Sequence, residues 1–163
     1  MEDFKIVTER TIGFLVKDDK IWLSRKKEGQ GAGNLNGFGG KLEPRETPED
    51  AAVREIFEES DGIIVEKKDL IKRAQIDFHF PFKGEWNQRT HVYFVKKWSG
   101  DFGETKEMAK AEPLDIKNIP YSKMWDSDKY WLPIILGGRR IRAYFRWKED
   151  NKTVDRYSIE FLD

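Results

Sequence analysis

GKLEPRETPEDAAVREIFEES, residues 40–60, is the stretch of this sequence that decides its fold. Residues 47–60 are predicted to be a helix, because Thr47 suits the N-cap and Pro48 suits the first helical position. The next two residues are acidic, and such side chains are favourable at the positive end of the helix dipole. The stretch therefore predicts a helix with a well-defined start.

Three carboxylates are predicted to project together from this helix. Glu55, Glu58 and Glu59 are three or four residues apart, so they are neighbours on the helix surface. At about 100° per residue, we place them opposite an apolar face. That face consists of Ala52, Val53, Ile56 and Phe57. Crowded carboxylates indicate either a solvated acidic surface or a site for a hard cation such as Mg²⁺, and the helix alone leaves both alternatives open.

The residues around the helix resemble the Nudix box. That box is written Gly, five residues, Glu, seven residues, then Arg-Glu-aliphatic-x-Glu-Glu, and every fixed position between Gly40 and Glu59 matches it. The family's next glycine falls at Asp61, whereas the glycine here is Gly62. Either Asp61 takes the left-handed conformation or the helix runs one residue longer. The resemblance implies the Nudix fold, an α/β fold described as an αβα sandwich with a mixed central β-sheet.

The resemblance also implies roles for individual residues. The expected catalytic residues are Glu55, Glu58 and Glu59, with Glu59, or Glu55 through a water, as the base. The expected metal ligands are the same three glutamates, the Gly40 carbonyl and Glu107. The expected cofactor is Mg²⁺, with Mn²⁺ left open. Glu46 either holds Arg54 in place or is a surface carboxylate in a turn.

Segments outside the box narrow the resemblance to the MutT-homologue oxidised purine nucleoside triphosphatases. They are GAGNLNGFGGK (31–41), AQIDFHF (74–80), KEM (106–108) and IPYSKMWDSDKYWLPIIL (119–136). The resemblance implies Mg²⁺-dependent hydrolysis of a damaged purine nucleoside triphosphate, such as 8-oxo-dGTP or 2-hydroxy-dATP, to monophosphate and pyrophosphate. Two alternatives remain open: hydrolysis of a methylated or unmodified nucleoside triphosphate, and a Nudix module that binds nucleotides without turnover.

By the same resemblance, Asn36, Trp125 and Asp128 line the base pocket. A purine can stack on Trp125, an asparagine amide can read a purine edge, and burial can keep Asp128 protonated as a donor. Ser127 stands where the family has the first of two adjacent aspartates, so the substrate preference is expected to depend on it. The other expected substrate-binding residues are Thr11, Lys26, Phe38, Gly39, Gly40, Lys41, Phe78, Phe80, Met108 and Trp131. Taken singly, these residues also suit core, turn or N-cap positions.

Composition bounds the remaining properties. The chain has 163 residues, with 30 basic and 30 acidic side chains and no cysteine. Balanced charge argues against a nucleic acid polymer as partner and leaves a small polyanion such as a nucleotide. The absence of cysteine excludes disulfides and thiolate chemistry. The length and the lack of a Pro-, Gly- or Ser-rich linker predict a single domain over residues 1–163. The first ten residues are charged and no long apolar run follows, so we expect a cytoplasmic protein without a membrane partner. We also expect a monomer.

The pattern of the rest of the chain predicts strands around two helices. The expected elements are a hairpin of residues 11–17 and 21–25, a loop at 28–40, strands at 74–80 and 90–97, a helix at 127–136 with a kink or late start at Pro133, and a closing hairpin of 141–147 and 154–161. Strands that outnumber helices, with helices between strand groups, indicate a layered α/β fold.

Overall fold

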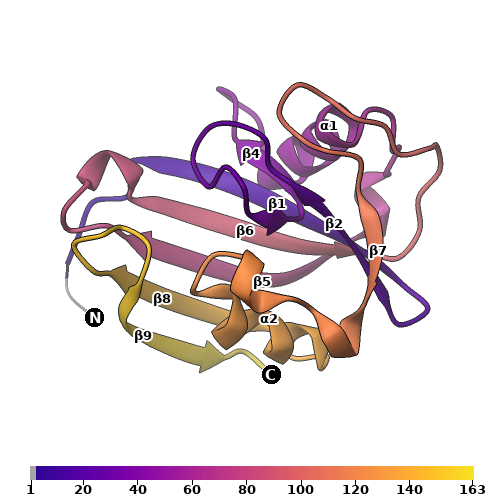
Figure 1. Ribbon diagram of the computed structural model, residues 1–163. Helices are drawn as coiled ribbons and strands as arrows, with labels where there is room; N and C mark the ends of the chain where they lie inside the picture. Colours follow the sequence, from indigo (N-terminus) through magenta and orange to yellow (C-terminus); the bar gives the residue numbers. More distant parts are fainter. Residues whose placement is uncertain (1–2) are drawn as a thin grey trace.

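A computed structural model describes residues 3–163, and within them nine strands form a mixed sheet (Figure 1). The strands are β1 (Thr8–Lys17), β2 (Lys20–Arg25), β3 (Leu35–Asn36), β4 (Phe38–Lys41), β5 (Leu70–His79), β6 (Gln88–Val95), β7 (Glu112–Asp115), β8 (Ile141–Trp147) and β9 (Val154–Phe161). Their order is β3-β2-β1-β6-β5-β8-β9, while β4 pairs with β1 and β7 with β2. The pairs β1–β6 and β5–β8 are parallel and the others antiparallel, which confirms the predicted mixed sheet.

Helices α1 (Pro48–Ser60) and α2 (Asp128–Leu136) pack against opposite faces of this sheet. Successive side chains of a strand point to opposite faces. On β1, Phe14 joins the buried cluster that contains Leu132 of α2, and its neighbour Leu15 joins the cluster that contains Ile56 of α1. Figure 1 shows α1 beside β4, and α2 beside β5 and β8. The expected sandwich of helix, sheet and helix is therefore present.

The start and end of α1 follow from local chemistry. Thr47 and Asp50 form a capping box, in which each side chain accepts a hydrogen bond from the other's backbone N–H. The helix ends at Ser60, and the C-cap residue Asp61 takes the left-handed conformation with φ of 60°. Of the two alternatives for the missing glycine, the structure therefore shows the first, with Asp61 in the place of the usual glycine.

The predicted faces of α1 were wrong at two positions. Phe57 is 51% exposed, whereas Glu59 is only 9% exposed and lies with the buried residues. Glu59 comes seven residues after Ala52, which is close to two full helical turns, so the two share one face. The carboxylates therefore do not all lie opposite the buried face, and Glu59 points into the protein.

The other elements confirm most of the expectations. The hairpin of β1 and β2 turns at Asp18 and Asp19, which both have positive φ, as a two-residue type I′ turn requires. The closing hairpin has the bounds predicted for it, and α2 begins at Asp128 and continues through Pro133 without a late start. The predicted loop at 28–40 was wrong at its end, because β3 and most of β4 fall within it.

Strand β7 was not predicted because its sequence lacks a strand pattern. It reads Glu-Pro-Leu-Asp, and Pro113 cannot donate to a ladder of hydrogen bonds. The segment nevertheless pairs antiparallel with β2, at a position where proline is tolerated. Tertiary pairing therefore decided the conformation of this segment.

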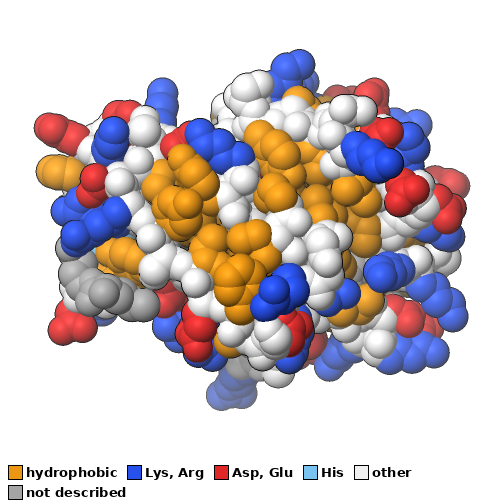
Figure 2. Space-filling view, turned by 90° about the horizontal axis from the view of Figure 1, so that it is seen from below, with side chains coloured by type: hydrophobic (Ala, Val, Ile, Leu, Met, Phe, Trp, Pro, Cys, Tyr) orange, Lys and Arg blue, Asp and Glu red, His pale blue; other side chains and the backbone are white. Residues whose placement is uncertain are grey.

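The surface outside the sheet core is mixed. Seen from below in Figure 2, hydrophobic side chains gather across the middle of one face, and charged side chains line its periphery. Exposed apolar side chains include Tyr157 and Phe161 of the edge strand β9. None of the helices in residues 3–163 has the length and apolar character needed to cross a bilayer.

Candidate active site

One cavity brings together most of the residues predicted to bind substrate. Strands β1, β4, β5 and β6 contribute to its walls, and the segment that leads into α2 closes one part. The predicted residues that line it are Thr11, Lys26, Asn36, Gly39, Gly40, Phe78, Phe80, Met108, Trp125, Ser127, Asp128 and Trp131. Glu59 lines the same cavity. The predicted base pocket and one predicted catalytic carboxylate therefore share one space.

Five predicted residues lie outside the cavity lining: Glu55 and Glu58, which contact Arg54, and three others. The side chain of Phe38 is fully buried in the cluster on the α1 side of the sheet, and the two glycines beside it line the cavity instead. Lys41 is exposed, and its carbonyl accepts a hydrogen bond from Arg54. Glu107 is exposed, and its carbonyl accepts a hydrogen bond from the Lys27 backbone. Of the three predicted catalytic glutamates, only Glu59 therefore lines the cavity.

The cavity also contains polar residues that the sequence analysis missed. They include Arg10, Gln30, Gln88 and Thr90. Gln88, Thr90 and Val92 occupy every second position of β6, so they share one face of the strand, and all three line the cavity. Polar residues on the buried face of a strand could have indicated a binding site in the sequence. The sequence alone does not show which face of β6 is buried, so these residues could not be singled out.

Aromatic side chains form the base end of the cavity. The rings of Trp125 and Trp147 meet edge to face at 5.5 Å, and Trp147 stacks on Phe80 at 5.4 Å. Gly31 lies against Trp125, since an added Cβ there would be 2.8 Å from the indole Nε1. Trp125 is only partly buried, so it offers apolar surface to a flat ligand.

Asn36 is oriented by its own backbone. Its Oδ1 accepts a hydrogen bond from the Gly37 N–H at 2.9 Å. The amide oxygen is thus oriented and keeps a second lone pair, and both Nδ2 donors remain for a ligand. Asn36 can therefore still present a donor and an acceptor to a purine edge, which stays a prediction.

Asp128 is buried at the base end with few polar neighbours. It is 5% exposed, and Ser127, fully buried, donates to its Oδ1 across a long 3.4 Å. Burial raises the pKa of Asp128 to about 7, against smaller opposing effects of Ser127 and Trp131. Trp131 acts on this carboxyl group from nearby, but within residues 3–163 its buried indole Nε1 does not reach hydrogen-bond geometry with any partner. Asp128 therefore exchanges its proton near neutral pH, so its protonated form, which the predicted donor role needs, is populated there.

Glu59 is held at the other end of the cavity by β4. Its Oε1 accepts a hydrogen bond from the Gly39 N–H at 2.8 Å. Burial raises the pKa of Glu59 to about 7, and the negative charges of Glu55 and Glu107 act in the same direction. The hydrogen bond from Gly39 and the positive charge of Lys26 oppose this rise. A carboxylate with this pKa can exchange a proton near neutral pH.

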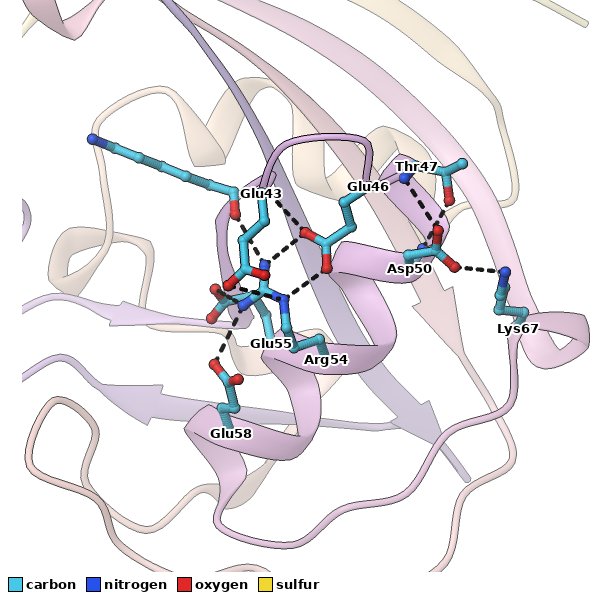
Figure 3. A network of polar contacts seen from close by, with 9 residues as sticks. Glu43, Glu46, Thr47, Asp50, Arg54, Glu55, Glu58 and Lys67 are labelled. Carbon is cyan, nitrogen blue, oxygen red and sulfur yellow. Dashed lines mark hydrogen bonds and ion pairs between the residues drawn. The ribbon is translucent and has the colours of Figure 1, made fainter.

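Arg54 organises the outer carboxylates (Figure 3). Its guanidinium donates two hydrogen bonds to Glu46, at 2.7 and 2.8 Å, one to Glu55 at 2.7 Å and one to Glu58 at 3.3 Å. The hydrogen bonds to Glu46 are the largest of the causes that raise the pKa of Arg54. Glu46 therefore holds Arg54 in place, which is the first of the two roles considered for it.

The carboxylates offer suitable donors for a divalent cation but are not yet gathered around one point. Within residues 3–163, no three His, Cys, Asp or Glu side chains lie close enough together to form a ready metal site. Glu55 lies against the Gly40 backbone, because an added Cβ there would be 2.5 Å from its Oε1. Burial raises the pKa of Glu55, and its charge raises that of Glu59. A hard cation accepts such oxygen ligands and would relieve this repulsion.

Comparisons with known proteins agree with this architecture. The family model for the NUDIX domain matches residues 7–133. The chain is 37% identical over 153 residues to the oxidized purine nucleoside triphosphate hydrolase of Danio rerio, covering 94% of this chain and 95% of that protein. It is 33% identical over 153 residues to the Mus musculus protein of that description, covering 94% of each.

A solved structure shows the same fold at low sequence identity. The MutT protein from Bacillus halodurans superimposes with a TM-score of 0.79 at 19% identity, over 94% of this chain and 97% of that one. Because the family model covers most of the chain, and the sequence relatives align over nearly their whole length, the chain belongs to the NUDIX family of hydrolases.

Proposed function

We propose that this chain hydrolyses oxidised purine nucleoside triphosphates to the monophosphate and pyrophosphate, with Mg²⁺ as cofactor. The observation that carries the proposal is the single cavity that joins Trp125 and Asp128 to Glu59. A base held at the aromatic end directs its phosphates toward the carboxylate end. The names of the two sequence relatives support the choice of substrate.

The residues of the chain divide the work between binding and proton transfer. Trp125 offers a stacking surface, Asn36 donates from Nδ2, and protonated Asp128 donates from its carboxyl group. Bound Mg²⁺ would supply positive charge to the phosphates and lower the pKa of a water, with Glu55, Glu58, Glu59 and the Gly40 carbonyl as its proposed ligands. The Gly39 N–H orients the Glu59 carboxylate through Oε1, which keeps a further lone pair for the cation, and Oε2 is left to accept a proton from the attacking water.

A panel of nucleotides tests the proposal. Pyrophosphate release is measured with 8-oxo-dGTP, 2-hydroxy-dATP, a methylated purine triphosphate, dGTP and dCTP. We expect the oxidised purines to have the highest kcat/KM. Glu59→Gln should lower turnover by about 100-fold or more, whereas Glu149→Gln, at an exposed turn outside the cavity, should not. Equal turnover of dGTP or dCTP would contradict the substrate assignment, and an active Glu59→Gln variant would contradict the catalytic one.

A second candidate is hydrolysis of another modified or unmodified nucleoside triphosphate. Ser127 favours it, because a buried hydroxyl replaces a carboxylate beside Asp128 and makes only a long hydrogen bond to it. The panel separates the two candidates by the identity of the best substrate. Nucleotide binding in calorimetry without any Mg²⁺-dependent product would instead indicate a binding module.

We further propose that the chain acts as a cytoplasmic monomer on a small nucleotide rather than on a nucleic acid polymer. The equal numbers of basic and acidic side chains support the small ligand. Light scattering during size exclusion checks the monomer, and cell fractionation checks the compartment. A stable dimer or a preference for polymeric nucleic acid would contradict this proposal.

A further inference from the structure

Arg10 is a cation built into the wall of the substrate cavity. It lies on β1 opposite Thr90 of β6, and both side chains line the cavity. Ile12, two residues further along β1, lines the cavity as well. Arg10 thus occupies an inward position of a central strand, where an apolar residue would be the ordinary choice.

The guanidinium of Arg10 has no protein partner in the part of the chain that the structure describes. Within residues 3–163, its side chain makes no hydrogen bond and no ion pair, and the same holds for the ammonium group of Lys26. Arg54, in contrast, bonds three carboxylates. A cation that is partly removed from water without a partner costs free energy. Such a cost is expected where a ligand supplies the missing partner.

The two unpartnered cations are close to each other and to the carboxylate end. Burial lowers the pKa of Lys26, and the positive charge of Arg10 lowers it further. Burial likewise lowers the pKa of Arg10, although the negative charges of Glu55 and Glu59 oppose this. Two cations that repel each other inside one cavity provide a place for an anion, at the end where the phosphates of the substrate would lie.

We propose that Arg10 binds a phosphate group of the substrate, with Lys26 as the second cation of the same subsite. The planar guanidinium can donate two parallel hydrogen bonds to two oxygens of one phosphate, while an ammonium acts as a point charge. This inference rests on the proposed function, because it takes the ligand to be a nucleoside phosphate. It assigns to Arg10 a binding role, separate from recognition of the base by Asn36 and Asp128.

The structural alternative is that Arg10 only balances the charges of Glu55 and Glu59. The two roles differ in the protein without ligand. A necessary counter-charge would lower stability when removed. A phosphate-binding cation that has no partner should leave the thermal midpoint unchanged or raise it, because burial is the largest influence on Arg10 and disfavours its charge.

Calorimetry with three probes tests the proposal in the full chain. The probes are the nucleoside 8-oxo-deoxyguanosine, its 5′-monophosphate and inorganic triphosphate, and the variants are Arg10→Met, Arg10→Lys and the exposed control Arg142→Met. We expect Arg10→Met to weaken binding of the monophosphate and of inorganic triphosphate by about 10-fold, with the nucleoside unchanged. Arg10→Lys should restore part of the loss, and Arg142→Met should match the wild type.

The outcomes separate this inference from the proposed function. Unchanged phosphate binding in Arg10→Met overturns the inference, as does an equal loss for the nucleoside and the monophosphate. A lower thermal midpoint with unchanged phosphate binding identifies Arg10 as a structural counter-charge. Inorganic triphosphate carries no base, so its binding tests Arg10 even if the wild type shows no preference for oxidised purines. Failure of that preference alone contradicts the proposed function and leaves the role of Arg10 standing.

Discussion

The Gly39 N–H donates a hydrogen bond to Oε1 of Glu59 at 2.8 Å and so ties β4 to the last turn of α1. This bond fixes the carboxylate from the side of the sheet. The neighbouring Gly40 backbone lies against Glu55 in a similar way. The two glycines thus set the positions of the two carboxylates most buried on α1, and they allow a test of positioning that leaves every carboxylate in the chain.

Gly40→Ala should disturb Glu55 more than it disturbs the fold. The three atoms nearest the added Cβ would all belong to the Glu55 carboxylate, with Oε1 at 2.5 Å, and a side chain can move aside. We expect activity to fall by about 10- to 100-fold, with a thermal midpoint close to that of the wild type. Pyrophosphate release and thermal unfolding measure the two effects.

Two further glycine variants serve as controls, one expected to destabilise the fold and one expected to have no effect. Gly39→Ala should unfold more readily, because its Cβ would lie 1.9 Å from the Thr11 carbonyl oxygen, which belongs to the backbone. We expect a loss of about 3 kcal/mol or more. Gly84→Ala meets nothing within 4 Å and should change neither quantity. A Gly40→Ala enzyme with normal activity would show that Glu55 does not need its present position.

Arg54→Lys should lower both stability and activity, because an ammonium cannot reproduce the pattern of bonds to Glu46, Glu55 and Glu58. The side chain of Glu46 is 12% exposed, so its charge would lose a partly buried partner. We expect a loss of about 1–3 kcal/mol in the free energy of unfolding and about 10-fold in activity. Urea denaturation and steady-state kinetics measure these, with the exposed Arg142→Lys as control. Wild-type values for Arg54→Lys would contradict an organising role for the guanidinium.

Asp128 predicts how stability depends on pH. Burial raises its pKa from 3.8 to about 7, so the folded protein holds a proton that the unfolded chain releases. The stabilisation from this proton is complete below about pH 4 and is lost as pH rises through about 7. In Asp128→Asn, which has no proton to lose, the decline should be smaller by about 2 kcal/mol.

Urea denaturation of the metal-free protein at pH 5.5 and pH 8 measures this difference. Glu59 contributes in the same direction, since its pKa is also raised to about 7, and its contribution remains in the variant. Subtracting the two proteins therefore isolates Asp128. An equal decline in both proteins would mean that Asp128 is ionised throughout this range when the protein is folded.

The elements predicted correctly are those whose bounds depend on their own residues. Thr47 and Asp50 carry the start of α1 in their own side chains, and the bounds of β8 and β9 follow from their alternation. Strand β7 could not be predicted, because its conformation depends on pairing with β2 and not on its own residues. The same holds for the exposure of Phe57, because the packing of α1 on the sheet decides which helix face is buried.

The candidate site shows the same division. The box placed Glu59 and Gly40 at the cavity, and the resemblance placed Trp125 and Asp128 there. Arg10 was missed, because its inward orientation follows from the register between β1 and β6. The prediction that Phe38 lines the cavity failed for a related reason. The sequence does not show which side chains of β4 point toward the cavity, and that of Phe38 packs in the cluster on the α1 side of the sheet.

Ser127→Asp should alter which purine the enzyme prefers. Ser127 is fully buried, and its Oγ lies 3.4 Å from Oδ1 of Asp128, so a carboxyl group placed there would compete with Asp128 for a proton. Two acids this close cannot both ionise at neutral pH, so one becomes a donor and the other an acceptor. We expect the ratio of kcat/KM between 8-oxo-dGTP and 2-hydroxy-dATP to change by about 5-fold or more, with a loss of about 1–3 kcal/mol in stability.

Ser127→Ala separates the effect of the new acid from that of the lost hydroxyl. The hydroxyl makes only a long hydrogen bond to Asp128, so its removal should change the ratio little and cost less than about 1 kcal/mol. If Ser127→Asp and Ser127→Ala shift the ratio equally, the hydroxyl and not the pair of acids controls the preference. If neither variant shifts the ratio, the purine edge is read by other groups of the cavity, of which the Asn36 amide is the first to substitute.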